Sequence, residues 1–180
     1  MNCLTAADYS NDDYFHYAYD AVGNRLTQDT LAGTNTYTYD IANRLTSVDG
    51  VAYTWDANGN LLNDGANAYA YDAANRLISV VGPDATSSFS YNGLGDRLQQ
   101  TANGMPTSYT LDLNMGLTQV LSDGTNAYLY GVGRISQHNL TPDTNSPEYF
   151  LGDALGSVRQ LVDPAGVVTL SQSYAPYGDT

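Results

Sequence analysis

The sequence has 180 residues, of which 42% are hydrophobic, so its length and composition allow one ordinary domain with a buried core. Its formal net charge of −13 opposes binding to the phosphate backbone of nucleic acid and to anionic membrane surfaces. No apolar run is long enough to span a membrane, the first residues lack the basic and apolar regions of a signal peptide, and the lone Cys3 cannot form an internal disulfide.

The residue types favour strands joined by tight turns. There are 16 Tyr and 17 Gly residues against three Phe and one Trp, there is no Lys, and Glu148 is the single Glu. Apolar residues do not recur at helical spacing over any long segment. We therefore predict an all-β chain with little or no helix.

One sequence pattern, two aromatic residues and an Asp followed by Asn, Arg and Leu, recurs in at least five copies. The second aromatic residues of consecutive copies are separated by 20, 16, 16 and 20 residues. Weaker forms follow at 109-YTLDLNMGL-117 and 128-YLYGVGRI-135. Such a period predicts a repeat architecture in which each copy is one supersecondary unit. The five copies are 17-YAYDAVGNRL-26, 37-YTYDIANRL-45, 53-YTWDANGNLL-62, 69-YAYDAANRL-77 and 89-FSYNGLGDRL-98.

Each copy is predicted to fold as a β-hairpin. Residues two apart in a strand point to the same face, so Tyr37 and Tyr39 form an aromatic pair. The Asp, Asn and Gly residues that follow accept turn conformations, and Arg and Leu then begin a return strand. Because a two-stranded hairpin is only marginally stable alone, the copies are expected to pair side by side in one antiparallel sheet.

The repeated Asp and Arg residues flank the same predicted turn. We expect ion pairs, or hydrogen bonds from Arg to the backbone, that fix the register of each hairpin. A ladder of arginines that binds anionic ligands is the alternative, although the neighbouring Asp residues would cancel its field. The residues that define the repeat, all predicted to be structural, are Tyr17, Tyr19, Asp20, Arg25, Tyr37, Tyr39, Asp40, Arg44, Tyr53, Trp55, Asp56, Tyr69, Tyr71, Asp72, Arg76, Tyr91 and Arg97.

The two histidines are not placed as catalytic residues usually are. His16 lies in the first aromatic strand and His138 in a polar loop, and neither has a partner at a diagnostic spacing. One Cys and two distant His residues do not make a zinc site. We therefore predict no catalytic residue, no metal and no cofactor, and hence no enzyme.

One acidic turn and the tyrosines each have a second interpretation. Asp56, Asn58 and Asn60 match the first three ligand positions of an EF-hand calcium loop, but Leu61 and Asn67 replace its later Gly and Glu, so we favour a plain turn. For most tyrosines we favour packing within the sheet. An exposed aromatic platform for sugar rings is the alternative.

The pattern changes after residue 148. Glycines punctuate short β-runs, and the segment 163–166 predicts a turn between 158-VRQLV-162 and 167-VVTLS-171. The segment 149–178 closely resembles the start of the RHS repeat-associated core domain, and the upstream copies resemble the YD (RHS) repeats of the same proteins. That family includes bacterial polymorphic toxins, the C components of insecticidal toxin complexes, wall-associated proteins and teneurins. The core-motif residues are Asp153, Gly156, Ser157, Arg159, Asp163, Gly166, Tyr174, Tyr177 and Gly178.

The resemblance implies a long β-sheet that spirals into a hollow shell, which in toxin members encloses a C-terminal toxin domain. In members that cleave themselves, an aspartyl autoprotease lies in a later core motif, so Asp153, Arg159 and Asp163 are not carried over as catalytic residues. We accordingly expect a shell-wall segment. Its expected partners are neighbouring shell segments, or the rest of its own polypeptide, and a toxin cargo, with no nucleic acid. The family implies secretion or display on a bacterial surface.

The alternative function is a carbohydrate-binding or adhesive surface module that uses exposed Tyr and Trp rings. For either function we expect three regions: a lead-in at residues 1–13, with disorder as one alternative, YD repeats at 14–147 that degenerate after about residue 100, and the truncated start of the core domain at 148–180. We expect a fragment, or the remnant of a gene. About eight hairpins would close only a narrow ring, so this piece alone should enclose no folded cargo.

Overall fold

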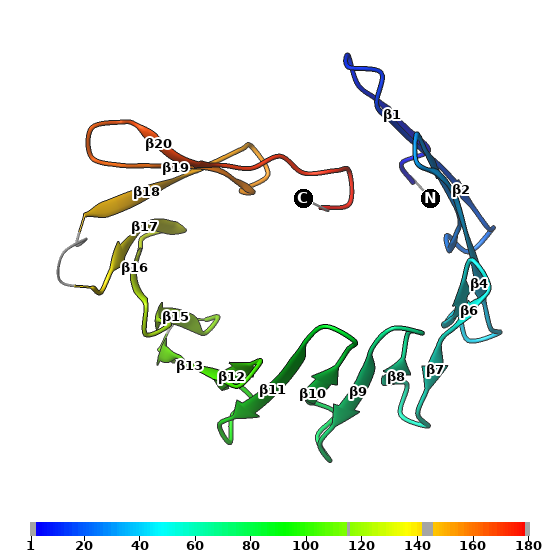
Figure 1. Cartoon of the computed structure of the whole chain (residues 1–180), viewed down its shortest axis with the longest axis horizontal. Helices are drawn as coiled ribbons and strands as arrows, with labels where there is room; N and C mark the ends of the chain where they lie inside the picture. The colour runs from blue at the N-terminus through cyan, green and yellow to red at the C-terminus, as the bar shows by residue number, and fades with distance from the viewer. Residues whose placement is uncertain (1–2, 115, 142–145, 179–180) are drawn as a thin grey trace. The chain divides into compact units, whose positions relative to one another are not determined.

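The computed structural model describes residues 3–114, 116–141 and 146–178, and in these residues all regular structure is β-strand (Figure 1). The strands pair antiparallel with their neighbours in sequence, which confirms the prediction of an all-β chain built from hairpins. Among the described residues they form three sheets, so the prediction of one continuous sheet was wrong. No helix among the described residues could cross a membrane. The chain forms two compact units, residues 1–86 and residues 87–180.

Unit 1 contains short strands that follow one another in chain order. The first six form one sheet, and the next four continue in a second sheet. Their bounds are β1 Ala6–Asp8, β2 Tyr14–Tyr19, β3 Arg25–Thr30, β4 Gly33–Tyr39, β5 Leu45–Val48, β6 Val51–Ala52, β7 Thr54–Trp55, β8 Leu61–Asn63, β9 Ala68–Tyr71 and β10 Leu77–Val81.

Unit 2 has the same organisation. Strands β11 to β13 pair in order, and β14 to β20 form a seven-stranded sheet. Their bounds are β11 Thr86–Tyr91, β12 Arg97–Ala102, β13 Met105–Ser108, β14 Thr110–Asp112, β15 Gln119–Ser122, β16 Asn126–Tyr130, β17 Arg134–Asn139, β18 Pro147–Gly152, β19 Val158–Val162 and β20 Val168–Ser171.

Part of the lead-in is an ordered edge strand. β1 pairs antiparallel with β2, with Ala6 opposite His16 and Asp8 opposite Tyr14. The imidazole Nε2 of His16 also lies 2.9 Å from Oδ1 of Asp8. Residues 6–8 of the lead-in are thus a strand, whereas the three region boundaries themselves stay predictions.

Each sheet has one face that is more buried and another that is exposed. Burial alternates along β9 and β11 between exposed and half-buried residues, as expected when one face of a strand is covered. Among the described residues only Tyr17, Leu161 and Ser136 are buried, with 7%, 7% and 1% of their surface exposed. The core is thus a thin layer on the face of the sheet that carries the aromatic side chains. Because this core is small, the regular pairing of the strands has to supply much of the stability.

Candidate functional site

The repeated feature of the structure is one hairpin turn, which occurs with the same geometry seven times among the described residues. In the turn that begins at Asp40, the N–H of Asp40 donates to the carbonyl of Arg44 at 2.9 Å. The N–H of Asn43 donates to the carbonyl of Asp40 at 3.0 Å. Asn43 has a φ of 59°, and Gly or Asn takes this left-handed position in each copy. A one-residue register shift follows every turn. The seven turns begin at Asp20, Asp40, Asp56, Asp72, Asn92, Asp153 and Asp163.

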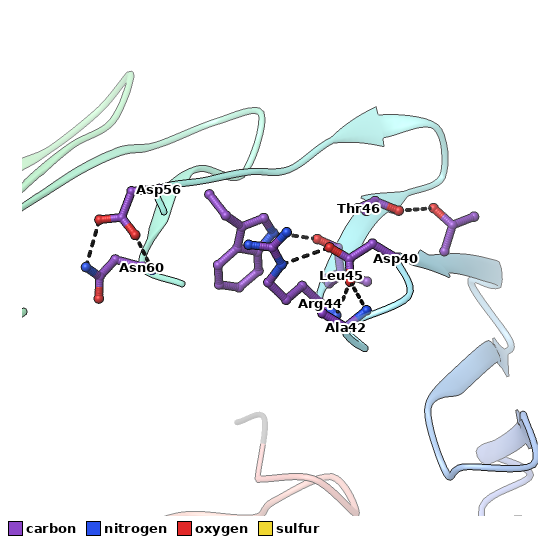
Figure 2. Close-up of polar contacts among 9 residues, drawn as sticks. Asp40, Ala42, Arg44, Leu45, Thr46, Asp56 and Asn60 are labelled. Carbon is purple, nitrogen blue, oxygen red and sulfur yellow. Dashed lines mark hydrogen bonds and ion pairs between the residues drawn. The ribbon is translucent and has the colours of Figure 1, made fainter. Parts of the chain in front are cut away.

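The first side chain of each turn holds the backbone of that turn. Oδ1 of Asp40 accepts the N–H groups of Ala42 at 2.8 Å and of Arg44 at 3.0 Å (Figure 2), and the equivalent pair of bonds is present in all seven copies. Asp and Asn suit this position because their short side chains reach the backbone two and four residues on. The same bonds occupy Asp56, which supports a turn rather than a calcium loop.

In four of the seven turns, the side chain of the fifth residue also donates to the second carboxylate oxygen of the first residue. Nε of Arg44 lies 2.8 Å from Oδ2 of Asp40, and Nε of Arg76 lies 2.7 Å from Oδ2 of Asp72, so the predicted Asp–Arg pairs are confirmed in these two copies. In the Asp56 turn the carboxamide of Asn60 donates at 2.8 Å instead (Figure 2). Backbone donation by Arg44 lowers the pKa of Asp40, and the Asn60 side chain lowers that of Asp56.

The arginines of the repeat are not equivalent, although the sequence pattern aligned them at one position. Arg44 and Arg76 are the fifth residue of their turns, whereas Arg25 and Arg97 come one residue later and begin the return strand. A shift of one residue moves a strand side chain to the opposite face. The guanidinium of Arg25 accordingly lies over the Tyr37 ring, 4.5 Å from its centroid, and that of Arg97 lies 4.7 Å from the Phe89 centroid.

The second aromatic residue of a repeat ties consecutive hairpins together. The hydroxyl of Tyr39 donates to the carbonyl of Arg25 at 3.0 Å, and the indole N–H of Trp55 donates to the carbonyl of Leu45 at 2.8 Å. Both acceptors lie five residues after the first residue of the preceding turn. Burial of the hydroxyl raises the pKa of Tyr39.

The rings of the repeat therefore serve as packing and as hydrogen-bonding links. Tyr17 is buried, with 7% of its surface exposed. The other aromatic residues that define the repeat are half-buried, namely Tyr19, Tyr37, Tyr39, Tyr53, Trp55, Tyr69, Tyr71 and Tyr91.

A second motif, which the repeat search missed, pairs a tyrosine with an aspartate at other turns. The hydroxyl of Tyr69 donates to Oδ2 of Asp64 at 2.7 Å, and that of Tyr128 donates to Oδ2 of Asp123 at 2.6 Å. Burial, together with the bond to Asp123, raises the pKa of Tyr128 to about 12. The signal was present in the sequence, because 64-DGANAY-69 and 123-DGTNAY-128 differ at one position.

The core-motif residues separate into two groups. Asp153, Ser157, Arg159, Tyr174 and Gly178 line one hollow of about 630 Å³, and Gly156, with a φ of 84°, gives the adjoining turn its left-handed residue. The other members do not line this hollow: Asp163 and Gly166 form the turn between β19 and β20, and Tyr177 is 54% exposed.

The two histidines lie in different strands. The side chains of the His16 and Asp8 pair are 48% and 70% exposed. The prediction that His138 lies in a polar loop was wrong, because His138 is part of β17 and lies opposite Ala127. In residues 3–114, 116–141 and 146–178 no group of three His, Cys, Asp or Glu side chains is placed to hold a metal ion. The carboxylates of the repeat turns accept hydrogen bonds from the backbone of their own turns.

Residues 3–180 match the family model described as Teneurin YD-shell. The tRNA3(Ser)-specific nuclease WapA of Bacillus spizizenii is 31% identical over 192 residues, and the tRNA nuclease WapA of Bacillus subtilis is 30% identical over 189 residues. Each alignment covers 99% of this chain but only 8% of the relative.

Two solved structures also resemble the chain. One is a TcdB2–TccC3 complex without its hypervariable C-terminal region, at 18% identity and a TM-score of 0.48, and the match covers 96% of this chain and 14% of that one. The other is a Photorhabdus luminescens Tc holotoxin pore, at 18% identity and a TM-score of 0.46, and the match covers 93% of this chain and 13% of that one.

Proposed function

Because this chain belongs to the teneurin YD-shell family, we propose that it forms part of the wall of a β-shell that encloses a C-terminal toxin domain and helps to deliver it. Its partners are then neighbouring shell segments, or the rest of its own polypeptide, and the toxin cargo. The chain spans 8% of the length of the curated relatives it matches, and both are named as tRNA nucleases. A nuclease is therefore one class of cargo that such a wall would surround.

The observation that carries this proposal is the way one hairpin is joined to the next. The side chain of Trp55 donates to the backbone of the preceding hairpin at Leu45, and Tyr39 does the same at Arg25. Asn24 adds a bond between neighbouring turns, with its Nδ2 2.9 Å from Oδ1 of Asn43. Links of this kind can be repeated without limit, so they suit an extended wall better than a closed globular domain.

The chain itself has no catalytic role in this proposal. The carboxylates of Asp40, Asp56 and Asp72 accept three hydrogen bonds each within their own turns, which leaves them poorly placed to transfer protons to a substrate. Any enzymatic activity would reside in the cargo. Secretion or display on a bacterial surface is the location that fits a delivery protein.

The adhesive alternative is less well supported. A sugar-binding platform needs adjacent aromatic faces open to solvent, together with polar groups that fix the ligand. Here the hydroxyls of Tyr39 and Tyr174 and the indole N–H of Trp55 already donate to backbone carbonyls. A glycan array probed with the purified chain is the direct test of this alternative, and binding to any arrayed glycan would revive it.

A chimera tests the wall function. The aligned segment of the Bacillus subtilis relative would be replaced by this chain, and tRNA cleavage would be measured before and after limited proteolysis. We expect the chimera to keep its cargo as protease-resistant as the parent does, whereas a control that lacks the segment loses protection. Equal sensitivity of the chimera and the deletion control would contradict the proposal. A second chimera with Trp55→Phe should show intermediate protection.

A further inference from the structure

The hollow of about 630 Å³ in unit 2 lies between two neighbouring turns of the sheet. One wall comes from the β18–β19 turn and from β19, and the other from the segment that follows β20. The hydroxyl of Tyr174 donates to the carbonyl of Val158 at 2.7 Å, and the N–H of Gln172 donates to the carbonyl of Arg159 at 2.8 Å. These bonds hold the two walls together. The side chains used below belong to Asp153, Leu155, Ser157, Arg159, Tyr174 and Pro176.

The carboxylate of Asp153 accepts fewer hydrogen bonds than the carboxylates of Asp40, Asp56 and Asp72. Its Oδ1 accepts the N–H groups of Leu155 at 2.9 Å and Ser157 at 3.0 Å, as in every copy. The fifth residue of this turn is Ser157, and its hydroxyl does not close on Oδ2 as the longer Arg44 side chain does on its own turn. Among the described residues the nearest cationic group is Nε of Arg159, which at 3.9 Å is beyond hydrogen-bonding distance.

The side chains of Asp153 and Arg159, which lie too far apart for a hydrogen bond, are partly open to solvent. Arg159 is 43% exposed and Asp153 is 35% exposed. Together they present an acceptor and a group of donors side by side, with no net charge between them. The ring of Tyr174 lies against the Arg159 guanidinium, 5.4 Å from centroid to Cζ, which limits how far that guanidinium can move.

The same chain shows what the second oxygen of such a turn prefers to bind. Nδ2 of Asn24 donates to Oδ2 of Asp20 at 2.8 Å, and Nδ2 of Asn60 donates to Oδ2 of Asp56 at 2.8 Å. A primary carboxamide therefore fits this oxygen in two copies. A carboxamide also carries a carbonyl acceptor, which the guanidinium beside Asp153 could satisfy at the same time.

We propose that this hollow binds the carboxamide side chain of an Asn or Gln residue from a partner polypeptide. Its NH₂ group would donate to Asp153 and its carbonyl would accept from Arg159, while Leu155, Tyr174 and Pro176 contact the aliphatic part. A cationic side chain would be attracted by Asp153 but repelled by Arg159, and an anionic one the reverse, so the pair as a whole favours neither charge over a neutral carboxamide. Only the identity of the partner, an Asn-bearing turn of a neighbouring shell segment, rests on the proposed wall function.

The test is a titration of the isotope-labelled chain followed by NMR. The probes are the N-methylamides of N-acetylasparagine, N-acetylaspartic acid and N-acetylarginine, so that only the asparagine side chain offers a primary carboxamide. We expect saturable shifts of the Ser157 amide and the Arg159 side chain with the asparagine probe, and weaker binding of the two charged probes. The proposal is overturned if the asparagine probe gives no saturable shift, or if either charged probe binds as tightly.

A pair of matched variants locates the site. Ser157→Asn should place a carboxamide on Asp153 from within the turn, as Asn60 does on Asp56, and weaken probe binding by about tenfold or more. Val167→Asn makes the same change in the Asp163 turn, away from the hollow, and should leave the affinity unchanged. Equal affinity in the two variants would contradict the proposed site. Because the probes need no enclosed cargo, this outcome is independent of the wall function.

Discussion

Trp55 and Leu45 are joined across consecutive hairpins by a hydrogen bond of 2.8 Å from the indole N–H to the main-chain carbonyl. Tyr39 makes the equivalent bond to Arg25 from a hydroxyl of different shape and reach. What is preserved between copies is thus a donor at the tip of a half-buried ring, and not one residue type. The second aromatic residue has to supply both area for packing and a polar tip.

Removal of this donor should destabilise the chain. Tyr39→Phe keeps the ring but leaves the Arg25 carbonyl without its donor, so we expect a loss of about 1 kcal/mol in the free energy of unfolding. Trp55→Phe should cost at least as much, since it also removes apolar area. Urea denaturation followed by circular dichroism measures both. Tyr149→Phe is the control, because this ring is 39% exposed, and it should leave the midpoint unchanged. An equal loss of stability in all three variants would show that the hydrogen bonds of Tyr39 and Trp55 make no specific contribution.

The left-handed position of the turn gives a second prediction. Asn43 has a φ of 59°, and its Oδ1 accepts the bond from Asn24. Asn43→Ala should lose that bond and also strain the backbone by about 1 kcal/mol, whereas Asn43→Gly loses the bond without the strain. Thermal unfolding should therefore rank wild type above Gly and Gly above Ala. If Ala proved at least as stable as Gly, strain at this position would not limit stability.

The turn carboxylates predict when acid unfolds the chain. Hydrogen bonds to Asp40 and Asp56, from the backbone of Arg44 and the side chain of Asn60, lower the pKa values of both groups. A lowered pKa in the folded state adds stability that is complete above the unfolded value, near 3.9, and is lost as the pH falls through the folded value. Circular dichroism should therefore show no loss of strand signal from pH 7 to about 5 and cooperative loss below about 4. Loss of structure at pH 5–6 would mean that other groups control it. In the part of the chain that the structure describes, the other aspartates with lowered pKa are Asp20, Asp64, Asp72, Asp96 and Asp123.

Much of the fold could be predicted from the sequence because it depends on local chemistry that repeats. The pair of Tyr37 and Tyr39 and the Asp40 turn follow from strand periodicity and from turn-forming residues. The pairing of Asp40 with Arg44 was predicted for the same reason. The different role of Arg25 was not predicted, because the copies were aligned by residue type alone. One additional residue between Asp and Arg places the Arg25 side chain on the opposite face of the strand.

The hollow beside Asp153 could not be predicted from the sequence, for a different reason. Its walls come from the β18–β19 turn with β19 and from the segment after β20, and the pairing of β19 with β20 brings Tyr174 next to Arg159. The absence of a closing side chain at Ser157 also becomes meaningful only when the turn is superimposed on its better-closed copies. The core motif named these residues without showing that they meet.

The pairing of Tyr128 with Asp123 predicts a delayed ionisation of one tyrosine. Burial and the bond to Asp123 raise the pKa of Tyr128 to about 12, above the ordinary value near 10. A raised folded-state pKa gives stability that is complete below the unfolded value and is lost as the pH rises from about 10 to 12. NMR titration of ring-labelled tyrosine should find Tyr128 still protonated at pH 11. Asp123→Asn removes the charge but keeps an acceptor and the burial, so the pKa should fall part of the way towards 10. An unchanged pKa in this variant would assign the whole shift to burial.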